Sequence, residues 1–210
     1  LTDPWRELTQ AHVLSEQSFA HDVIREGVLR GLPAPIAQWI HAAVAAFVDT
    51  HGAVHARAAF HWRSAGEMQR AAAAYLLAGQ FAFEAGRVTE QIELLQQAAD
   101  LSEQQGDFPA AFDALRWLVV GLLQSRPADA TGALFERLDR LAGSDFERAE
   151  CARTQAIARM TLWDFDGVVA AADRALPHYA ASDHEDAGVC AHAVRATRAV
   201  RAMRKSSSRS

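Results

Sequence analysis

Residues 65–107 read AGEMQRAAAAYLLAGQFAFEAGRVTEQIELLQQAADLSEQQGD, and a glycine-centred turn recurs in them every 20 residues, at Gly66, Gly86 and Gly106. Between these turns, apolar residues return at steps of three and four, which is the period of an α-helix and not of a strand. Two helices joined by a turn of two or three residues run antiparallel. A helix hairpin that repeats about every 40 residues is typical of a right-handed α-solenoid.

Each of the three predicted helices has one apolar face, on which alanines next to large residues allow close helix approach. The faces consist of Ala71, Tyr75, Ala78, Ala82 and Phe83; of Ile92, Leu95, Ala98, Ala99 and Leu101; and of Ala111, Leu115, Leu118, Val119 and Leu122. The spacing of Gly66, Ala71, Tyr75 and Ala78 resembles half of a tetratricopeptide repeat. The Trp-Leu-Gly half is missing and the helices are longer than a 34-residue repeat permits. The chain therefore resembles this repeat class rather than its consensus.

Further helices are predicted beyond Pro127, although their spacing is less regular. Capping boxes at Ser144 with Glu147, and at Ser182 with Glu185, predict helices that begin near positions 145 and 183. Residues 164–167 turn the chain into a helix over 168–176, which Pro177 should end, as Arg126-Pro127 should end an earlier helix. No alternating apolar run of strand length is found, so the predicted fold class is all-α.

The composition indicates a folded globular protein, because half of the residues are apolar and 22% are charged. The longest apolar stretches, residues 40–48 and 115–123, are too short to span a bilayer. No membrane segment and no export signal are predicted. The first residue is Leu1 rather than Met, which suggests a piece of a longer polypeptide. We expect Cys151 and Cys190 to be buried free thiols in a cytoplasmic protein.

The net charge of −5 is unevenly distributed, because no acidic residue follows Asp186 whereas six basic residues do. Four of the basic residues lie three apart on one predicted helix: Arg195, Arg198, Arg201 and Arg204. Positive charge is favourable near the end of a helix without any ligand. Because no aromatic residue or recognition motif accompanies these arginines, nucleic-acid binding through this segment is not expected.

The sequence lacks the motifs of a complete active site. The single lysine, Lys205, lies in a Ser-rich tail, so no Walker A phosphate-binding loop is present. There is no Gly-x-Ser-x-Gly, His-Glu-x-x-His or Cys-x-x-Cys motif. We expect no catalytic residue, no metal site and no cofactor in this chain. A helical enzyme with an unrecognised motif stays open as one alternative function.

Two groups of histidines could bind a metal ion, but the sequence favours a structural role for both. His51 and His55 are four residues apart, with His61 nearby, but Gly52 weakens a helix there and no acid or thiol completes a zinc site. We interpret them as surface histidines. His178 and His184, together with Asp183, are predicted to form a polar loop.

Three stretches before the repeats carry a resemblance to a known superfamily. They are SFAHDVIREGV at 18–28, followed by Leu32-Pro33, then IAQWIHAAVA at 36–45 and AAFHWRSAGE at 58–67. Their order resembles the junction between the winged helix and the helical arm in STAND-type ATPases. These nucleotide switches include bacterial transcriptional activators with LuxR-type or OmpR-like DNA-binding domains. The resemblance covers essentially the whole chain, and the string His21-Asp22-Val23-Ile24-Arg25-Glu26 is its most specific part.

The resemblance implies a role for His21, with Asp22 beside it, in nucleotide sensing by a full-length parent protein. In that superfamily, the histidine of a Met-His-Asp-like triplet reaches the β-phosphate of ADP and helps to hold the closed state. Ala20 stands where Met is common in the eukaryotic members. A histidine can donate a charge-assisted hydrogen bond to phosphate. The alternative is that His21 packs within a winged-helix remnant.

The sequence thus predicts a winged-helix end with connecting helices over residues 1–64, tetratricopeptide-like repeats over 65–204, and a flexible tail over 205–210. The expected function is a sensor or protein-interaction arm of a bacterial STAND-type ATPase that regulates transcription. A protein partner or a small inducer would bind the repeats, and ATP or ADP would bind elsewhere in the parent. The alternative is a free-standing tetratricopeptide-like adaptor that binds a peptide or a protein.

Overall fold

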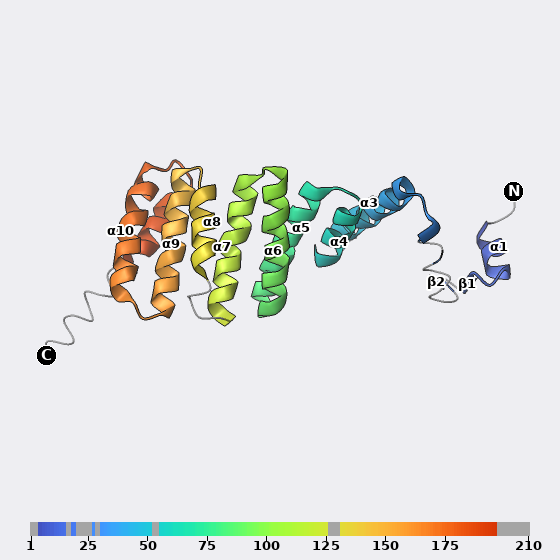
Figure 1. Cartoon of the computed structure of the whole chain (residues 1–210), viewed down its shortest axis with the longest axis horizontal. Coiled ribbons are helices and arrows are strands. Elements are labelled where there is room, and N and C mark those ends of the chain that lie inside the picture. The colour runs from blue at the N-terminus through green and yellow to red at the C-terminus, as the bar shows by residue number, and fades with distance from the viewer. Residues whose placement is uncertain are drawn as a thin grey trace.

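The computed structural model describes residues 4–15, 18–19, 27, 30–51, 55–125 and 131–196. The chain begins with α1 (Pro4–Gln10) and a hairpin of two-residue strands, β1 (Leu14–Ser15) and β2 (Ser18–Phe19). A row of helices follows (Figure 1): α3 (Ala34–His51), α4 (His55–Ser64), α5 (Met68–Glu84), α6 (Val88–Gln105), α7 (Phe108–Ser125), α8 (Gly132–Leu141), α9 (Asp145–Thr161) and α10 (Phe165–Ala181). Apart from this short hairpin, the described regular structure is helical, and the predicted all-α fold class is confirmed.

The three predicted glycine turns are present. Gly86 and Gly106 have φ angles of 69° and 73°, and Gly66 has one of 84°, all in the left-handed region. Glycine ends a helix in this conformation without the steric cost of a Cβ atom. Each glycine reverses the chain, so that the following helix packs against the preceding one (Figure 1).

The turn between α9 and α10 has the same geometry but a different residue. Trp163 has a φ angle of 58° and lies one residue before Asp164, the residue that caps α10. A left-handed conformation costs a residue with a Cβ atom roughly 1–2 kcal/mol. The Trp163 side chain is 73% exposed, so burial does not offset this cost.

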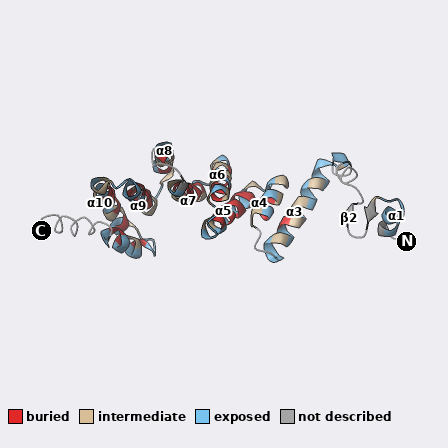
Figure 2. Ribbon diagram, turned by 90° about the horizontal axis from the view of Figure 1, so that it is seen from below, coloured by how far each residue is buried: buried red, intermediate tan, exposed pale blue. Residues whose placement is uncertain are grey.

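One core cluster runs from α3 to α9 (Figure 2) and consists mainly of alanine and leucine. Glycines within the helices mark the closest approaches: a Cβ atom added to Gly79 of α5 would lie 2.5 Å from Leu95 Cγ of α6. The cluster also joins Trp62 of α4 to Tyr75 of α5. The packing is therefore continuous across positions 64 and 65, where the sequence predicted a domain boundary. That boundary stays a prediction.

The helices from α8 to α10 are arranged less regularly. α7 packs directly on α9, and α8 is displaced from the row beside them (Figure 2). α9 and α10 form a close pair with a second core cluster, which includes Ala172 and Tyr179. The capping box predicted at the start of α9 is confirmed: Ser144 Oγ accepts from the Glu147 N–H, and the Glu147 carboxylate accepts from the Ser144 N–H.

Two helix boundaries predicted near the C-terminus are wrong. α10 does not end at Pro177 but continues to Ala181. An internal proline costs a helix about 3 kcal/mol. The last turn forms nevertheless, because Tyr179 is buried there and donates a hydrogen bond to Glu150.

The second predicted capping box also fails. Ser182 Oγ accepts from the N–H of His184, two residues on, and the His184 ring accepts from the N–H of Asp186. These local bonds hold a turn, so the next helix begins at Ala187 rather than near position 183. Within the described residues, no helix is long and apolar enough to cross a membrane.

Candidate functional site

The residues assigned to nucleotide sensing, His21 and Asp22, lie outside the described residues. The β1–β2 hairpin precedes them, with Leu14 paired to Phe19 and Ser15 paired to Ser18. Their role therefore stays a prediction.

The histidines at the α3–α4 junction do not form a metal site in the structure. His51 ends α3 and His55 begins α4, so the two do not share a helix. His61 instead pairs with His41, with 2.8 Å between the two Nδ1 atoms. Burial, together with His41 and Arg57, lowers the pKa of His61. In the part of the chain that the structure describes, no group of three or more His, Cys, Asp or Glu residues could hold a metal ion.

Both cysteines are free thiols, as predicted, but only Cys151 is fully buried. The Cys151 thiol donates to Asp139 at 3.0 Å, and burial raises its pKa. Cys190 is half-buried.

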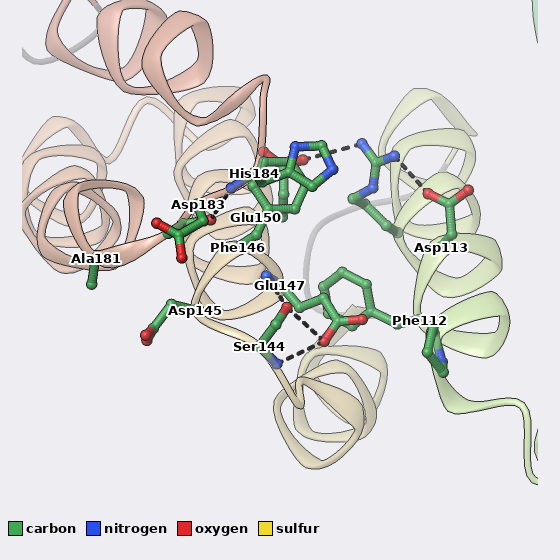
Figure 3. Close-up of a pocket in the computed structure, with 13 residues that line it drawn as sticks. Phe112, Asp113, Ser144, Asp145, Phe146, Glu147, Glu150, Ala181, Asp183 and His184 are labelled. Carbon is green, nitrogen blue, oxygen red and sulfur yellow. Dashed lines mark hydrogen bonds and ion pairs between the residues drawn. The ribbon is translucent and has the colours of Figure 1, made fainter.

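A pocket of about 490 Å³ lies between α7, α9 and the loop that follows α10 (Figure 3). Phe112, Asp113 and Arg116 line it from α7, Phe146 and Glu150 line it from α9, and Ser182, Asp183 and His184 line it from the loop. A volume of this size is in the range of small-molecule sites.

The inner wall of the pocket contains a buried carboxylate, Glu150, whose side chain is 4% exposed. Arg153 binds both of its oxygens, at 2.8 Å and 2.6 Å, and Arg116 approaches at 3.2 Å. The Tyr179 hydroxyl donates a further hydrogen bond. Burial raises the pKa of Glu150, but these donors outweigh it and lower the pKa below 4.5. Glu150 is therefore an anion that joins α7, α9 and α10.

Two aromatic rings close one side of the pocket. The imidazole of His184 stacks on Phe146, with ring centroids 3.7 Å apart and planes 11° from parallel. Phe146 also meets the edge of Tyr179. This stack fixes the Ser182–Asp186 loop against the start of α9, so the loop and α9 hold the pocket open (Figure 3).

The polar loop predicted around Asp183 is confirmed in part. His184 and Asp183 lie in the loop after α10, but His178 lies within α10 and contacts Asp145 at 2.8 Å. The difference follows from the continuation of α10 beyond Pro177. Of the C-terminal arginines, Arg195 is exposed at the end of the described helix. The other three lie outside the described residues: Arg198, Arg201 and Arg204.

Comparison of the chain with protein-family models, curated proteins and solved structures finds no match. The site is therefore defined by its geometry alone.

Sequence reasoning identified the first turn of α9 but not the pocket beside it. The missed residues include Phe112 and Arg116 of α7 and Glu150 of α9, and the bonded pair Arg116 and Glu150 is 34 residues apart in sequence. One signal was present: Glu150 lies in a run of small residues, Ala149, Cys151 and Ala152, all of which are buried. A charged residue in such a run requires a partner, but the sequence does not say which one.

Proposed function

We propose that this chain is the helical sensor arm of a bacterial, cytoplasmic STAND-type ATPase that regulates transcription. In this proposal the helices form a right-handed tetratricopeptide-like α-solenoid that binds a protein partner or a small inducer. The nucleotide would bind in another part of the parent protein. The chain itself would have no catalytic role.

The observation that carries this proposal is the row of long helix hairpins joined by left-handed turns. α5, α6 and α7 contain 17, 18 and 18 residues, and Gly86 and Gly106 separate them. Such rows present extended surfaces to partners rather than one enclosed active site. The pocket beside α7 and α9 lies in the same row, where an inducer would contact three elements at once.

The order of elements near the N-terminus supports the winged-helix part of the proposal. α1 is followed by the β1–β2 hairpin, and a helix followed by a hairpin is the order expected at the end of a winged helix. The hairpin ends at Phe19, immediately before the string that contains His21. His21 would then donate to the β-phosphate of ADP in the closed state.

The test uses the full-length parent with His21→Ala. Loss of one charge-assisted hydrogen bond costs the closed state about 1.5–3 kcal/mol, and about 1.4 kcal/mol shifts the closed-to-open ratio tenfold. We therefore expect faster ADP release and higher basal reporter transcription, measured at a matched folded fraction. Asp22→Ala should act in the same direction if Asp22 orients the imidazole. Unchanged ADP release would show that His21 only packs.

A free-standing adaptor is the alternative function. The observation that favours it is that the pocket is built from α7, α9 and the loop after α10, and so needs no nucleotide module. A parent sequence with a Walker A loop and an acidic Walker B strand upstream would exclude the adaptor. A parent without them would exclude the ATPase arm.

A further inference from the structure

We propose that the pocket between α7, α9 and the loop after α10 binds an organic cation, an ammonium or guanidinium group attached to an apolar body. The organic cation would be the ligand of the proposed sensor arm. Only its role as an effector rests on the proposed function. The binding itself is a property of the described residues.

The first argument is the charge around the pocket. Five carboxylates and one guanidinium line it. Arg153 and Arg148 lie outside the lining and pair with Glu150 and Asp145, which leaves an excess of two negative charges when His184 is neutral. Arg116 faces two of the acids, with 2.6 Å to Asp113 and 3.2 Å to Glu150. The carboxylate of Asp183 is exposed and, within the described residues, makes no hydrogen bond or ion pair. It is the group best placed to pair with a charge that enters from solvent.

The second argument is the aromatic lining, which is independent of the acids. Phe112 lines the pocket from α7, and the stacked rings of Phe146 and His184 line it from the opposite side (Figure 3). A cation within about 6 Å of an aromatic face is attracted by the ring quadrupole. The same rings bury the apolar body of a ligand. Carboxylates beside aromatic faces are a combination that selects organic cations over water or metal ions.

The third argument is that two of the donors that an anion could use are already occupied. The N–H of Glu147 in the first turn of α9 donates to Ser144 Oγ at 3.1 Å. The guanidinium of Arg116 is shared between Asp113 and Glu150. A phosphate or carboxylate ligand would have to displace these partners while it faced the surrounding acids. The pocket therefore favours a cation.

The experiment uses the 210-residue chain and two probes of nearly equal shape. Nα-acetyl-arginine methyl ester carries the guanidinium as its single charge, and Nα-acetyl-citrulline methyl ester replaces it with a neutral urea. We expect chemical-shift changes in backbone amides around residues 144–150 and 182–186 with the arginine ester only. Equal binding of the two esters, or no binding of the arginine ester up to about 10 mM, would overturn the proposal, because that concentration corresponds to a negligible affinity.

Two variants locate the binding. Asp183→Asn removes the charge of an exposed side chain without loss of volume, so the fold should persist. We expect it to weaken arginine ester binding about threefold to tenfold. Asp183→Lys, which reverses the charge, should weaken it further. Glu93→Gln is the matched control, since Glu93 is exposed on α6 and does not line the pocket. Equal losses in Asp183→Asn and Glu93→Gln would overturn the proposal.

A final pair of probes separates the two sources of the cation. A six-residue peptide with a central arginine is compared with the free ester, and the same peptide with citrulline is its control. Tighter binding of the arginine peptide identifies a peptide side chain as the ligand, and tighter binding of the ester identifies a small organic cation. Both outcomes support cation binding. Because these measurements need no nucleotide, a failure here leaves the ADP-release test in the parent unaffected.

Discussion

The middle and the end of this chain are both built from pairs of helices, but different interactions hold them together. Between α5 and α7 the helices meet mainly through alanine, leucine and glycine, with one buried amide, Gln91, that donates to the Trp117 carbonyl, and left-handed glycines reverse the chain. Between α9 and α10 the helices meet around the buried anion Glu150, and Trp163 takes the place of a turn glycine. The comparison separates a part stabilised by shape from a part that also depends on charge.

The difference matters for function because the two kinds of contact have different costs. Small apolar residues pack without any need for a specific partner. A buried carboxylate must find donors, and Glu150 takes them from Arg116, Arg153 and Tyr179. The candidate pocket lies beside the buried carboxylate of Glu150, which belongs to the second kind of contact. The variants below test whether this separation is real, from the largest expected effect to the smallest.

Tyr75→Ala should give the largest loss of stability. Tyr75 is 5% exposed and packs in the core cluster that joins α4, α5 and α6. Truncation of a buried aromatic side chain costs about 3–5 kcal/mol. Chemical denaturation monitored by circular dichroism measures this loss. Leu77→Ala on the exposed side of α5 is the control and should cost less than about 1 kcal/mol. Equal effects would mean that the buried face of α5 is wrongly assigned.

Glu150→Ala should be the next most costly change, at about 2–4 kcal/mol. Removal of one member of a buried ion pair costs about 3–5 kcal/mol. Arg116 and Arg153 are about a quarter exposed here and can partly rehydrate, which reduces the loss. Glu93→Ala should change the free energy of unfolding by less than about 0.5 kcal/mol. A similar result for both variants would remove the distinction between the two parts of the chain.

The contribution of Glu150 should also depend on pH. Its pKa is lowered in the folded protein, so the unfolded chain binds the proton first as the pH falls. The difference in stability between wild type and Glu150→Ala should be complete above the usual pKa of 4.5 and shrink as the pH falls through the lower folded value. Urea denaturation at several acidic pH values would show this. If the stability difference between wild type and Glu150→Ala stayed constant below the pKa of folded Glu150, this prediction would be wrong.

Matched substitutions in the two kinds of turn should change the stability of the fold in opposite directions. Gly86→Ala introduces a Cβ atom at a φ of 69° with no other atom within 4 Å, so only backbone strain remains, about 1 kcal/mol of destabilisation. Trp163→Gly removes the same backbone strain at a φ of 58° and should stabilise the folded chain. The gain is reduced because glycine gives the unfolded chain more conformational entropy. Thermal melts of the two variants measure the signs. Destabilisation by Trp163→Gly would show that its ring contributes more than its backbone costs.

The smallest expected effect concerns the α3–α4 pair. The pKa of His61 is lowered by burial, by His41 and by Arg57, so the unfolded chain takes up a proton more readily there. Neutral His61 contributes fully to stability above pH 6.5. This contribution declines as the pH falls from 6.5 toward the lower pKa of His61 in the folded protein. An NMR titration should show His41→Ala raising the pKa of His61. An unchanged pKa would mean that the two rings do not interact.

The sequence predicted the part of the chain that depends on local rules. Helix period, glycine turns and the Ser144–Glu147 cap are set by residues close together in sequence, and all are present. The errors lie where a distant contact overrides a local preference. Pro177 should end a helix, but the bond from Tyr179 to Glu150, 29 residues away, holds the last turn. The pocket could not be predicted for the same reason, because its walls meet only after α7 packs on α9.

The row of helices has a consequence for how the chain is made. The main contacts join each helix to a neighbour one or two places along the chain. Proteins rich in such sequence-local contacts fold quickly, because little chain must be closed into a loop before a contact forms. As the polypeptide leaves the ribosome, the α5–α6 pair can form before α9 has been synthesised. The Glu150 site must wait, because its last donor, Tyr179, arrives 29 residues later. The pocket is thus assembled later than the α5–α6 pair, and folding can begin without it.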